Sequence, residues 1–302
     1  MLRLFGDLDI KWMSYRKLAY AVSGLLIVVS IISLVAHGGP RLSVDFTGGT
    51  VIEAKVEPPQ SAETIRTAAA KADIGSPEIQ SIGGGGQYLF RLGLGELKTT
   101  AFPKIKEAIE STAPGTTVTL LKEETVGPKI GSELRTKAIW AVLIAMAGIL
   151  IYVGWRYEFM MALGAIIALF HDVLLTVGFI SVLNIELSLT VLAALLTIAG
   201  YSINDTIVVY DRVREQSRLL RRENFQRVID ISVNQTLSRT LLTGISVTMT
   251  IVAIIVWGGE VIRDFGVVML FGTVLGTYSS VYVASALALD IRGPETTRLR
   301  GK

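Results

Sequence analysis

Residues 199–215 read AGYSINDTIVVYDRVRE and place one carboxylate, Asp205, inside a stretch that is otherwise apolar enough to cross a membrane. An ionisable side chain at membrane depth costs about 2.5 kcal/mol or more. Such a group therefore normally faces the interior of a helix bundle and marks a path for an ion, a proton or a substrate. The alternative is a carboxylate that only holds its helix against a neighbour. Asp205 is thus the first candidate for a functional residue.

Apolar stretches on both sides of this segment are typical of a polytopic membrane protein. The chain has 302 residues, of which 51% are hydrophobic, and a mean hydropathy of +0.53. About 20 apolar residues cross a hydrocarbon core. Six stretches of about this length are bounded by charged or turn residues, at 17–36, 138–155, 159–183, 187–210, 240–257 and 265–289. The sequence therefore predicts an α-helical polytopic membrane protein with six transmembrane helices.

The distribution of Lys and Arg predicts the orientation of these helices. Four basic residues lie at or before the start of the first span, one lies at Arg156, seven lie between Arg212 and Arg239, and four follow the last span. The opposite short loops contain only Arg263. Basic short loops face the cytoplasm, so we expect both termini there. Attraction to the lipids of an anionic membrane surface then explains the net charge of +3, which gives no reason to expect nucleic acid.

Residues 38–136 form the long loop between the first two spans, and we expect them to fold as an extracytoplasmic domain. The pattern of apolar residues predicts, in order, a strand at 50–56, a helix at 61–72 with Ser61 as its N-cap, strands at 78–82 and 88–92, a helix at 101–111 and a strand at 117–124. This βαββαβ order is that of a ferredoxin-like α+β domain. The glycines at 83–86 are read as a hairpin linker, because no helix follows them at the spacing of a phosphate-binding loop.

The predicted organisation is a cytoplasmic tail with the first helix at residues 1–37, the extracytoplasmic domain at 38–136, helices two to six at 137–290, and a cytoplasmic tail at 291–302. The chain contains no cysteine, which excludes disulfides, thiolate metal sites and cysteine nucleophiles. We expect no catalytic residue, no metal and no cofactor.

Arg239, just before the fifth span, is the predicted partner of Asp205. Asp205 lies about 7 to 8 Å inside the predicted end of its span, at 1.5 Å per residue, and Arg239 enters at a similar depth. Apolar surroundings favour the protonated acid, whereas a nearby guanidinium favours the ionised form. Movement of Arg239 could therefore switch Asp205 between holding and releasing a proton. The alternative is an arginine that only extends to the membrane surface.

Asn204, next to Asp205, is included in the candidate proton pathway, although its position also predicts packing. It lies on one helix face with Gly200, Thr197 and Ala193. Small and polar residues on one face favour close contact with another helix.

Further candidates lie in the third and sixth spans. His171 and Asp172 fall near the middle of the third span, where they are either a proton relay or a buried structural pair. Gly272 and Gly276 form a small-residue stripe in the sixth span, continued by the serines at 279 and 280, and this stripe predicts close helix packing.

Two longer motifs point to a known family. VDFTGGT at residues 44–50 follows the first span, and GYSINDT at 200–206 continues into YDRVRE at 210–215. Together with YRK at 15–17 and SRT at 238–240, these motifs resemble the SecF family of bacterial protein-export subunits over nearly the whole chain. Asp45, Gly48 and Gly49 belong to the first motif. The glycines suit a backbone bend between the first span and the domain, Asp45 could cap or pair locally, and the motif's function is left open.

The resemblance implies a mechanism, partners and a location. SecF proteins belong to the RND superfamily, and with SecD they form a pseudo-symmetric unit of twelve spans that uses the proton motive force to assist the Sec translocon. By this resemblance the chain would lie in the bacterial inner membrane, with SecD, the translocon channel, the translocating preprotein, protons and membrane lipids as its partners. Asp205 and Arg239 match the proton path of the family, which would lie at the interface with SecD. The resemblance implies no enzymatic activity.

Other functions are compatible with parts of the sequence. A passive scaffold would bind SecD and the translocon without conducting protons. An intramembrane aspartyl protease would need a second Asp at the depth of Asp205, and we expect Asp172 to lie more than about 10 Å away in depth and Asp211 to lie at the membrane surface. A drug-efflux pump would need twice as many spans and a large substrate pocket. The proton-driven subunit is therefore the expected function, and the scaffold is the main alternative.

Overall fold

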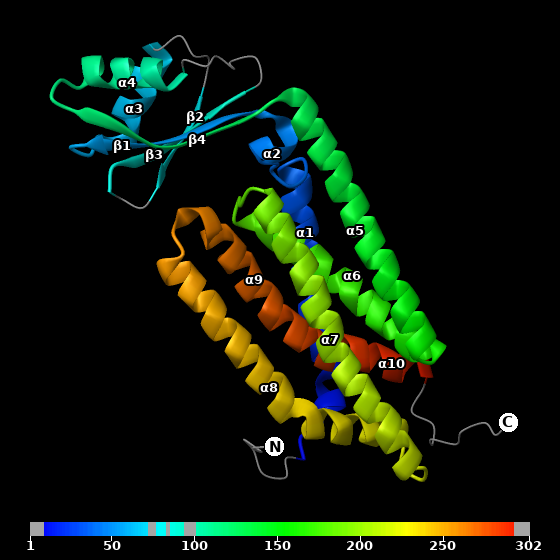
Figure 1. Ribbon diagram of the computed structural model, residues 1–302. Coiled ribbons are helices and arrows are strands. Elements are labelled where there is room, and N and C mark those ends of the chain that lie inside the picture. The colour runs from blue at the N-terminus through cyan, green and yellow to red at the C-terminus, as the bar shows by residue number, and fades with distance from the viewer. Residues whose placement is uncertain (1–8, 72–76, 83–84, 94–100, 293–302) are drawn as a thin grey trace. The chain divides into compact units, whose positions relative to one another are not determined.

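The structure is a computed structural model that describes residues 9–71, 77–82, 85–93 and 101–292. The chain divides into two compact units. One unit consists of Met1–Arg41 with Ala141–Lys302, and the other of Leu42–Trp140. The first contains most of the long apolar helices, and the second contains the sheet (Figure 1).

The sheet unit contains a four-stranded antiparallel sheet and two helices. Its elements are β1 Gly49–Glu57, α3 Ala62–Lys71, β2 Glu78–Ile82, β3 Gln87–Leu92, α4 Ala101–Thr112 and β4 Thr117–Val126. The strands lie in the order β2-β3-β1-β4. In the central strand β1, Ile52 is opposite Phe90 of β3 and Glu123 of β4. The βαββαβ prediction is therefore confirmed, with the strand order of a split βαβ fold; Ala72 and two of the hairpin glycines lie outside the described residues.

The core of the sheet unit forms between one face of the sheet and the two helices. Alternate residues of β1 and β3 are buried, because successive side chains of a strand point to opposite faces. Ile65 of α3 and Ile105 of α4 pack into the same cluster as Ile52 and Phe90, and all four are 0% exposed. The predicted N-cap is also present, since Thr64 N donates to Ser61 Oγ at 3.1 Å.

The motif at 44–50 forms a short helix, α2 Val44–Thr47, that the sequence did not predict. Ser43 caps this helix and accepts a hydrogen bond from Asp45 N at 3.2 Å. Gly48 and Gly49 then turn the chain into β1 with φ angles of +74° and +136°. A Cβ on Gly49 would lie 2.5 Å from Leu92 O. Both the backbone angles and the close approach therefore require glycine at the start of the central strand.

Six helices in the described residues are long and apolar enough to cross a membrane, which confirms the predicted number. They run over Trp12–Ala36, Pro128–Arg156, Phe159–Val182, Leu189–Leu219, Phe225–Trp257 and Ile262–Arg292. The first combines a 3-10 turn, η1 Trp12–Tyr15, with α1 Arg16–Ala36, and the next four are α5 Pro128–Arg156, α6 Phe159–Val182, α7 Leu189–Leu219 and α8 Phe225–Trp257. The last combines α9 Glu260–Ser279, the π-helical segment η3 Ser280–Ala284 and α10 Ser285–Arg292.

The prediction that the fourth span ends at 210 and the fifth begins at 240 is wrong about the helix ends. Helix α7 continues to Leu219, and α8 already begins at Phe225, where Asn224 Oδ1 caps it by accepting a hydrogen bond from Arg227 N at 2.7 Å. The first turns of α8 are amphipathic, with Phe225 and Val228 in the core. Figure 1 shows α8 bending so that these turns cross the ends of neighbouring helices. Most of the charged residues between 210 and 240 therefore lie on helices, and only a short turn separates α7 from α8.

Residues 9–15, which we call the N-terminal strap, are attached to these first turns of α8. Asn234 accepts a hydrogen bond from Trp12 Nε1 and donates one to Ile10 O, both at 2.9 Å. Met13 N donates to Asp230 Oδ1 at 2.9 Å. The strap thereby connects the start of α1 to α8.

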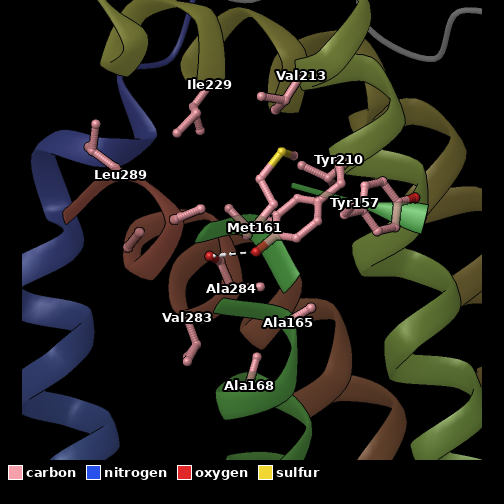
Figure 2. Packing of buried hydrophobic residues seen from close by; sticks show 14 of the residues in the cluster. Tyr157, Met161, Ala165, Ala168, Tyr210, Val213, Ile229, Val283, Ala284 and Leu289 are labelled. Carbon is pink, nitrogen blue, oxygen red and sulfur yellow. Dashed lines mark hydrogen bonds between the residues drawn. The ribbon is translucent and has the colours of Figure 1, made fainter. Parts of the chain in front are cut away.

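The π-helical segment η3 interrupts the last span next to a buried tyrosine. Tyr210 is 1% exposed, and its hydroxyl donates to Ala284 O at 2.9 Å, as Figure 2 shows among the surrounding apolar side chains. Ser285 Oγ donates to Ser280 O, also at 2.9 Å. Short π-helical segments are rare and frequently mark functional sites.

Candidate functional site

Asp205 lies in the middle of α7 and is almost fully buried, with 5% of its surface exposed. Its two carboxylate oxygens accept hydrogen bonds from two other elements. Thr240 Oγ1 of α8 donates to Oδ1 at 2.9 Å, and Ser280 Oγ of η3 donates to Oδ2 at 3.0 Å. Asp205 therefore faces the interior of the helix unit, as expected of a carboxylate at membrane depth.

Arg239, the predicted partner of Asp205, is exposed and immediately precedes Thr240. Among the described residues, no hydrogen bond or ion pair joins its guanidinium to Asp205, and it acts on the carboxylate only as a charge at a distance. Successive residues of a helix point about 100° apart. The structure accordingly places the hydroxyl of Thr240, rather than the guanidinium, against Asp205.

His171 and Asp172 of α6 form a second buried polar group. His171 Nδ1 is 2.8 Å from Asp172 Oδ1, and His171 Nε2 is 3.0 Å from Ser23 Oγ of α1. Asp172 Oδ2 accepts hydrogen bonds from Ser202 Oγ of α7 and Ser279 Oγ of α9. Asp172 is 0% exposed. This group therefore ties four helices together through polar contacts.

The two polar groups meet at consecutive serines. Ser279 binds Asp172, and Ser280 binds Asp205. Ser202, which also binds Asp172, precedes Asp205 by three residues on α7, a rise of about 4.5 Å. The expectation that Asp172 and Asp205 lie more than about 10 Å apart in depth is therefore wrong. That expectation rested on predicted span ends, and α7 extends well past its predicted end.

Asp211, the other acid near this region, has different partners. It accepts hydrogen bonds from Arg156 Nη2 and from the Tyr157 hydroxyl, both at 3.1 Å. Burial, together with the charge of Asp211, raises the pKa of Tyr157, which therefore remains a hydrogen-bond donor. This arrangement is a half-exposed ion pair near the end of α5.

A cavity of about 500 Å³ lies between α8 and α9 and extends to Thr240. Its wall is mostly apolar, with hydroxyl groups from Thr248, Thr273 and Thr277. Thr240, which binds Asp205, is therefore one of the residues that line this space.

The glycines of α9 lie where a side chain would not fit. A Cβ on Gly272 would be 2.2 Å from Ile198 Cδ1, and one on Gly276 would be 3.1 Å from Ser202 Cβ. Small residues at these positions allow α9 to approach α7 closely. Gly276 thereby also positions α9 beside Ser202, which binds Asp172.

Gly200 and Asn204 lie on a different face of α7, which is open. A Cβ on Gly200 would have no atom of another residue within 4 Å, and Asn204 is exposed. Ala193 and Thr197, the other members of this face, are exposed as well. Within the described residues, this face of α7 is uncovered.

The arrangement can bind and release protons. Hydroxyl groups hold both carboxylates, and a hydroxyl can either donate or accept a hydrogen bond. The described residues contain no group of three or more His, Asp, Glu or Cys side chains that could hold a metal ion.

Sequence reasoning missed the hydroxyl groups that hold the carboxylates. Ser23 and Thr240 were not singled out, and Ser279 and Ser280 were read only as small residues for packing. Ser202 could have been identified by its spacing, because it lies three residues before Asp205 and residues three or four positions apart share one face of a helix. Contacts between helices are not visible in this spacing.

Comparison with known proteins identifies one family. Residues 104–293 match the family described as protein export membrane protein SecD/SecF, C-terminal, and residues 33–60 match the SecD/SecF GG motif. Protein translocase subunit SecF of Calditerrivibrio nitroreducens is 41% identical over 95% of this chain and 95% of its own length. The SecF of Escherichia coli O157:H7 is 39% identical over 93% of this chain and 87% of its own length.

Two solved structures share the fold of this chain. The crystal structure of SecDF from Thermus thermophilus, described as a translocon-associated membrane protein, matches 97% of this chain with 36% identity and a TM-score of 0.86. A SecDF structure in the super-membrane-facing form matches 96% of this chain with 36% identity and a TM-score of 0.71. This chain spans 40% of the length of each of these SecDF chains.

Proposed function

This chain belongs to the SecD/SecF family of protein-export membrane proteins, and we propose that it is a SecF-type subunit that, together with SecD, uses the proton motive force to assist Sec-dependent protein translocation. Its relatives of nearly full length are protein translocase subunits. The names of these relatives do not mention protons. We infer the use of protons from the buried carboxylate of Asp205.

Asp205 supports proton binding because it is buried and, among the residues that the structure describes, no cation contacts it. Its hydrogen-bond partners are the hydroxyls of Thr240 and Ser280. Membrane-buried acids of this kind are rare and usually form part of an ion or proton path. A structural acid would need only to hold its helix, whereas this one lies where three separate elements meet.

Arg239 is proposed to tune Asp205 by moving. It acts on the carboxylate electrostatically without touching it, and it immediately precedes Thr240, which binds the carboxylate. A small rotation of α8 would bring the guanidinium nearer the carboxylate and favour release of the proton, while its withdrawal would favour uptake. Asn204, next to Asp205 on α7, is included in this path.

The partner SecD is proposed to cover the open face of α7. A face that carries Gly200 and Asn204 suits close approach and interhelical hydrogen bonding. This chain also spans 40% of the SecDF chains, whose remaining length would include the partner. The proton path would then lie beside the interface between two related halves.

The sheet unit is proposed to lie outside the cytoplasm and to act on the emerging preprotein, or to support the partner domain that does so, next to the translocon channel. Both termini would then be cytoplasmic, as the basic residues predict. Single cysteines at Gly85 and Arg221 test this, since the chain has none of its own. Membrane-impermeant reagents should label Gly85→Cys from outside and Arg221→Cys from inside; labelling from one side would overturn the topology.

The function is tested by preprotein translocation into vesicles that contain the complex with SecD, with and without an imposed proton gradient. Asp205→Asn retains the size of the side chain but cannot ionise, and Arg239→Met removes the tuning charge. Both should abolish stimulation by the gradient while leaving insertion and SecD binding intact. Asp205→Glu should retain part of the stimulation.

Asp211→Asn is the matched control, because it removes a carboxylate of the same helix that is bound to Arg156 instead. It should respond to the gradient like the parent. If Asp205→Asn and Arg239→Met also respond like the parent, the subunit is a passive scaffold that conducts no protons.

A further inference from the structure

Two consecutive serines at the junction of α9 and η3 bind two different buried carboxylates. Ser279 donates to Asp172 Oδ2, and Ser280 donates to Asp205 Oδ2. Both serines are 0% exposed. Consecutive residues of a helix point about 100° apart, and the change from α-helix to π-helix occurs at this pair. The side chains of two adjacent residues therefore contact the two acids.

Each serine also has a second acceptor on its own helix. Ser279 Oγ is 3.3 Å from Gly276 O, and Ser280 Oγ is 3.0 Å from Thr277 O. A serine hydroxyl has one proton to donate. Each serine can therefore donate either to its carboxylate or to its backbone carbonyl.

The second acceptor becomes important when an aspartate takes up a proton. An ionised carboxylate only accepts hydrogen bonds, whereas a protonated one has an O–H to donate. When Oδ2 of Asp205 is protonated, its O–H donates to Ser280 Oγ, and the hydroxyl proton of Ser280 turns to Thr277 O. Every buried group keeps a partner in both states, which avoids the cost of about 1–3 kcal/mol for an unpaired polar group.

The same exchange is available at the other acid. A proton on Oδ2 of Asp172 would donate to Ser279 Oγ, whose own proton then turns to Gly276 O. Ser202 Oγ binds the same carboxylate oxygen and keeps it fixed to α7. His171 holds the other oxygen, Oδ1.

The backbone that carries the serines is anchored on its far side. Tyr210 and Ser285 hold carbonyl groups of η3, as described above. A Cβ on Gly164 of α6 would lie 2.9 Å from Ala284 O, so α6 also packs directly against this segment. Ser279 and Ser280 are joined by one peptide bond, and η3 is held on its far side, so a backbone shift at one serine would also move the other.

We propose that Ser279 and Ser280 form a paired hydroxyl switch that couples the protonation of Asp172 to that of Asp205, which makes the His171–Asp172 pair a second proton-holding group of the site. This inference rests on the proposed use of protons by Asp205. The other titratable or charged groups that act on the acids are Arg239 of α8 and Tyr201 of α7 at Asp205, and His171 of α6 at Asp172. None of these three binds both carboxylates.

The test is infrared difference spectroscopy of the purified complex with SecD during a pH titration, which detects the C=O stretch of each protonated carboxyl group. Asp172→Asn and Asp205→Asn assign one band to each acid. In a parent with intact serines, Asp172→Asn should shift the midpoint of the Asp205 band by about one pH unit, the size at which two sites titrate as a coupled pair. With Ser279→Ala and Ser280→Ala together, the same substitution should leave the midpoint unchanged.

Two variants separate the switch from a loss of packing. Ser280→Thr, made with Ser279 intact, keeps both hydroxyl groups and should retain the coupling. Ser232→Ala is the matched control, because Ser232 is also 0% exposed but its hydroxyl binds only the carbonyl of Val228. It should leave both bands as in the parent.

Each contrary result overturns a separate statement. The proposal that the serines couple the two acids is wrong if Asp172→Asn shifts the titration midpoint of the Asp205 band equally with and without the serine hydroxyls. The proposal that the His171–Asp172 pair holds a proton is wrong if no carboxyl band responds to Asp172→Asn. The proposed function itself fails only if Asp205→Asn leaves the gradient response intact, which the translocation assay detects independently.

Discussion

Both units have an apolar core, and the helix unit buries carboxylates as well. The core of the sheet unit consists of apolar side chains such as Ile52 and Phe90. In the helix unit, large apolar side chains such as Ile151, which is 72% exposed, face outwards, whereas Asp172 and Asp205 are buried. Water drives apolar side chains into the sheet unit, but a surrounding membrane removes that driving force and makes exposed charge costly.

This contrast predicts different consequences of substitution in the two units. In the sheet unit, a buried side chain contributes mainly to stability. In the helix unit, stability depends on close backbone approach at small residues, and the buried polar side chains are free to serve function.

The largest effect on stability is expected for Phe90→Ala. It removes a fully buried ring from the centre of β3, and such substitutions cost about 3–5 kcal/mol. Hydrogen exchange of the β-strands in the intact chain would measure the loss. Leu121→Ala on β4 is the control, because Leu121 is 45% exposed and should change stability by less than about 0.5 kcal/mol. Equal effects of the two would show that the sheet unit has no apolar core.

Gly272→Leu should come next, with a cost of about 1–3 kcal/mol from overpacking against Ile198. Thermal unfolding of the purified chain measures this change. Gly200→Leu should leave the same unfolding transition in place, because in the described part of the chain no neighbouring atom lies within 4 Å of a Cβ at that position. It should instead weaken association with SecD. If both variants unfold like the parent and still bind SecD, neither helix face packs closely.

Asp205→Asn should change stability by only about 1 kcal/mol, because the amide oxygen still accepts one of the two hydroxyl bonds. The same variant should lose the gradient response entirely, so function and stability separate at this residue. Thermal unfolding measures the stability of the variant, and the translocation assay measures its response to the proton gradient. A large loss of stability would assign Asp205 a structural role.

The smallest effect is expected at the N-terminal strap, where Asp9 accepts a hydrogen bond from Arg227. That bond holds the pKa of Asp9 below its ordinary value of 3.8. The contribution of the pair is therefore present above that value and lost as the pH falls through the lowered pKa. Proteolysis of the strap should be unchanged from pH 5 to pH 8 in the parent and increase slightly in Asp9→Asn. A rise in the parent over that range would contradict the pairing.

The elements of the sheet unit could be predicted almost to the residue. Alternating apolar positions gave β2 with its observed ends, and Ser61 was identified as a cap, because strand periodicity and capping are local properties of the chain. Helix α2 was missed, since it is a single turn whose cap, Ser43, leaves no periodic pattern. The number of membrane helices was predicted, but several of their ends were not. Helix α5 begins at Pro128, before its predicted span at 138–155, and α7 and α8 extend into the segment between 210 and 240 that was predicted to connect two spans.

The candidate site could be predicted only in part. Asp205 and the His171–Asp172 pair were identified because a charge in an apolar stretch is visible in the sequence. Contact with Arg239 was expected, but the rotation of α8 places Thr240 there instead. Rotation about a helix axis depends on packing with several neighbours at once, which a linear sequence does not display.

The sequence by itself determined the class of the protein, its six spans, its α+β domain and its buried acids. These follow from hydropathy, periodicity and the cost of burying charge, which depend on residue type and local order. Only the tertiary structure decided that Ser279 and Ser280 join Asp172 to Asp205. Hydrogen bonds between helices require positions, rotations and a π-helical segment that are fixed by the packing of the whole helix unit.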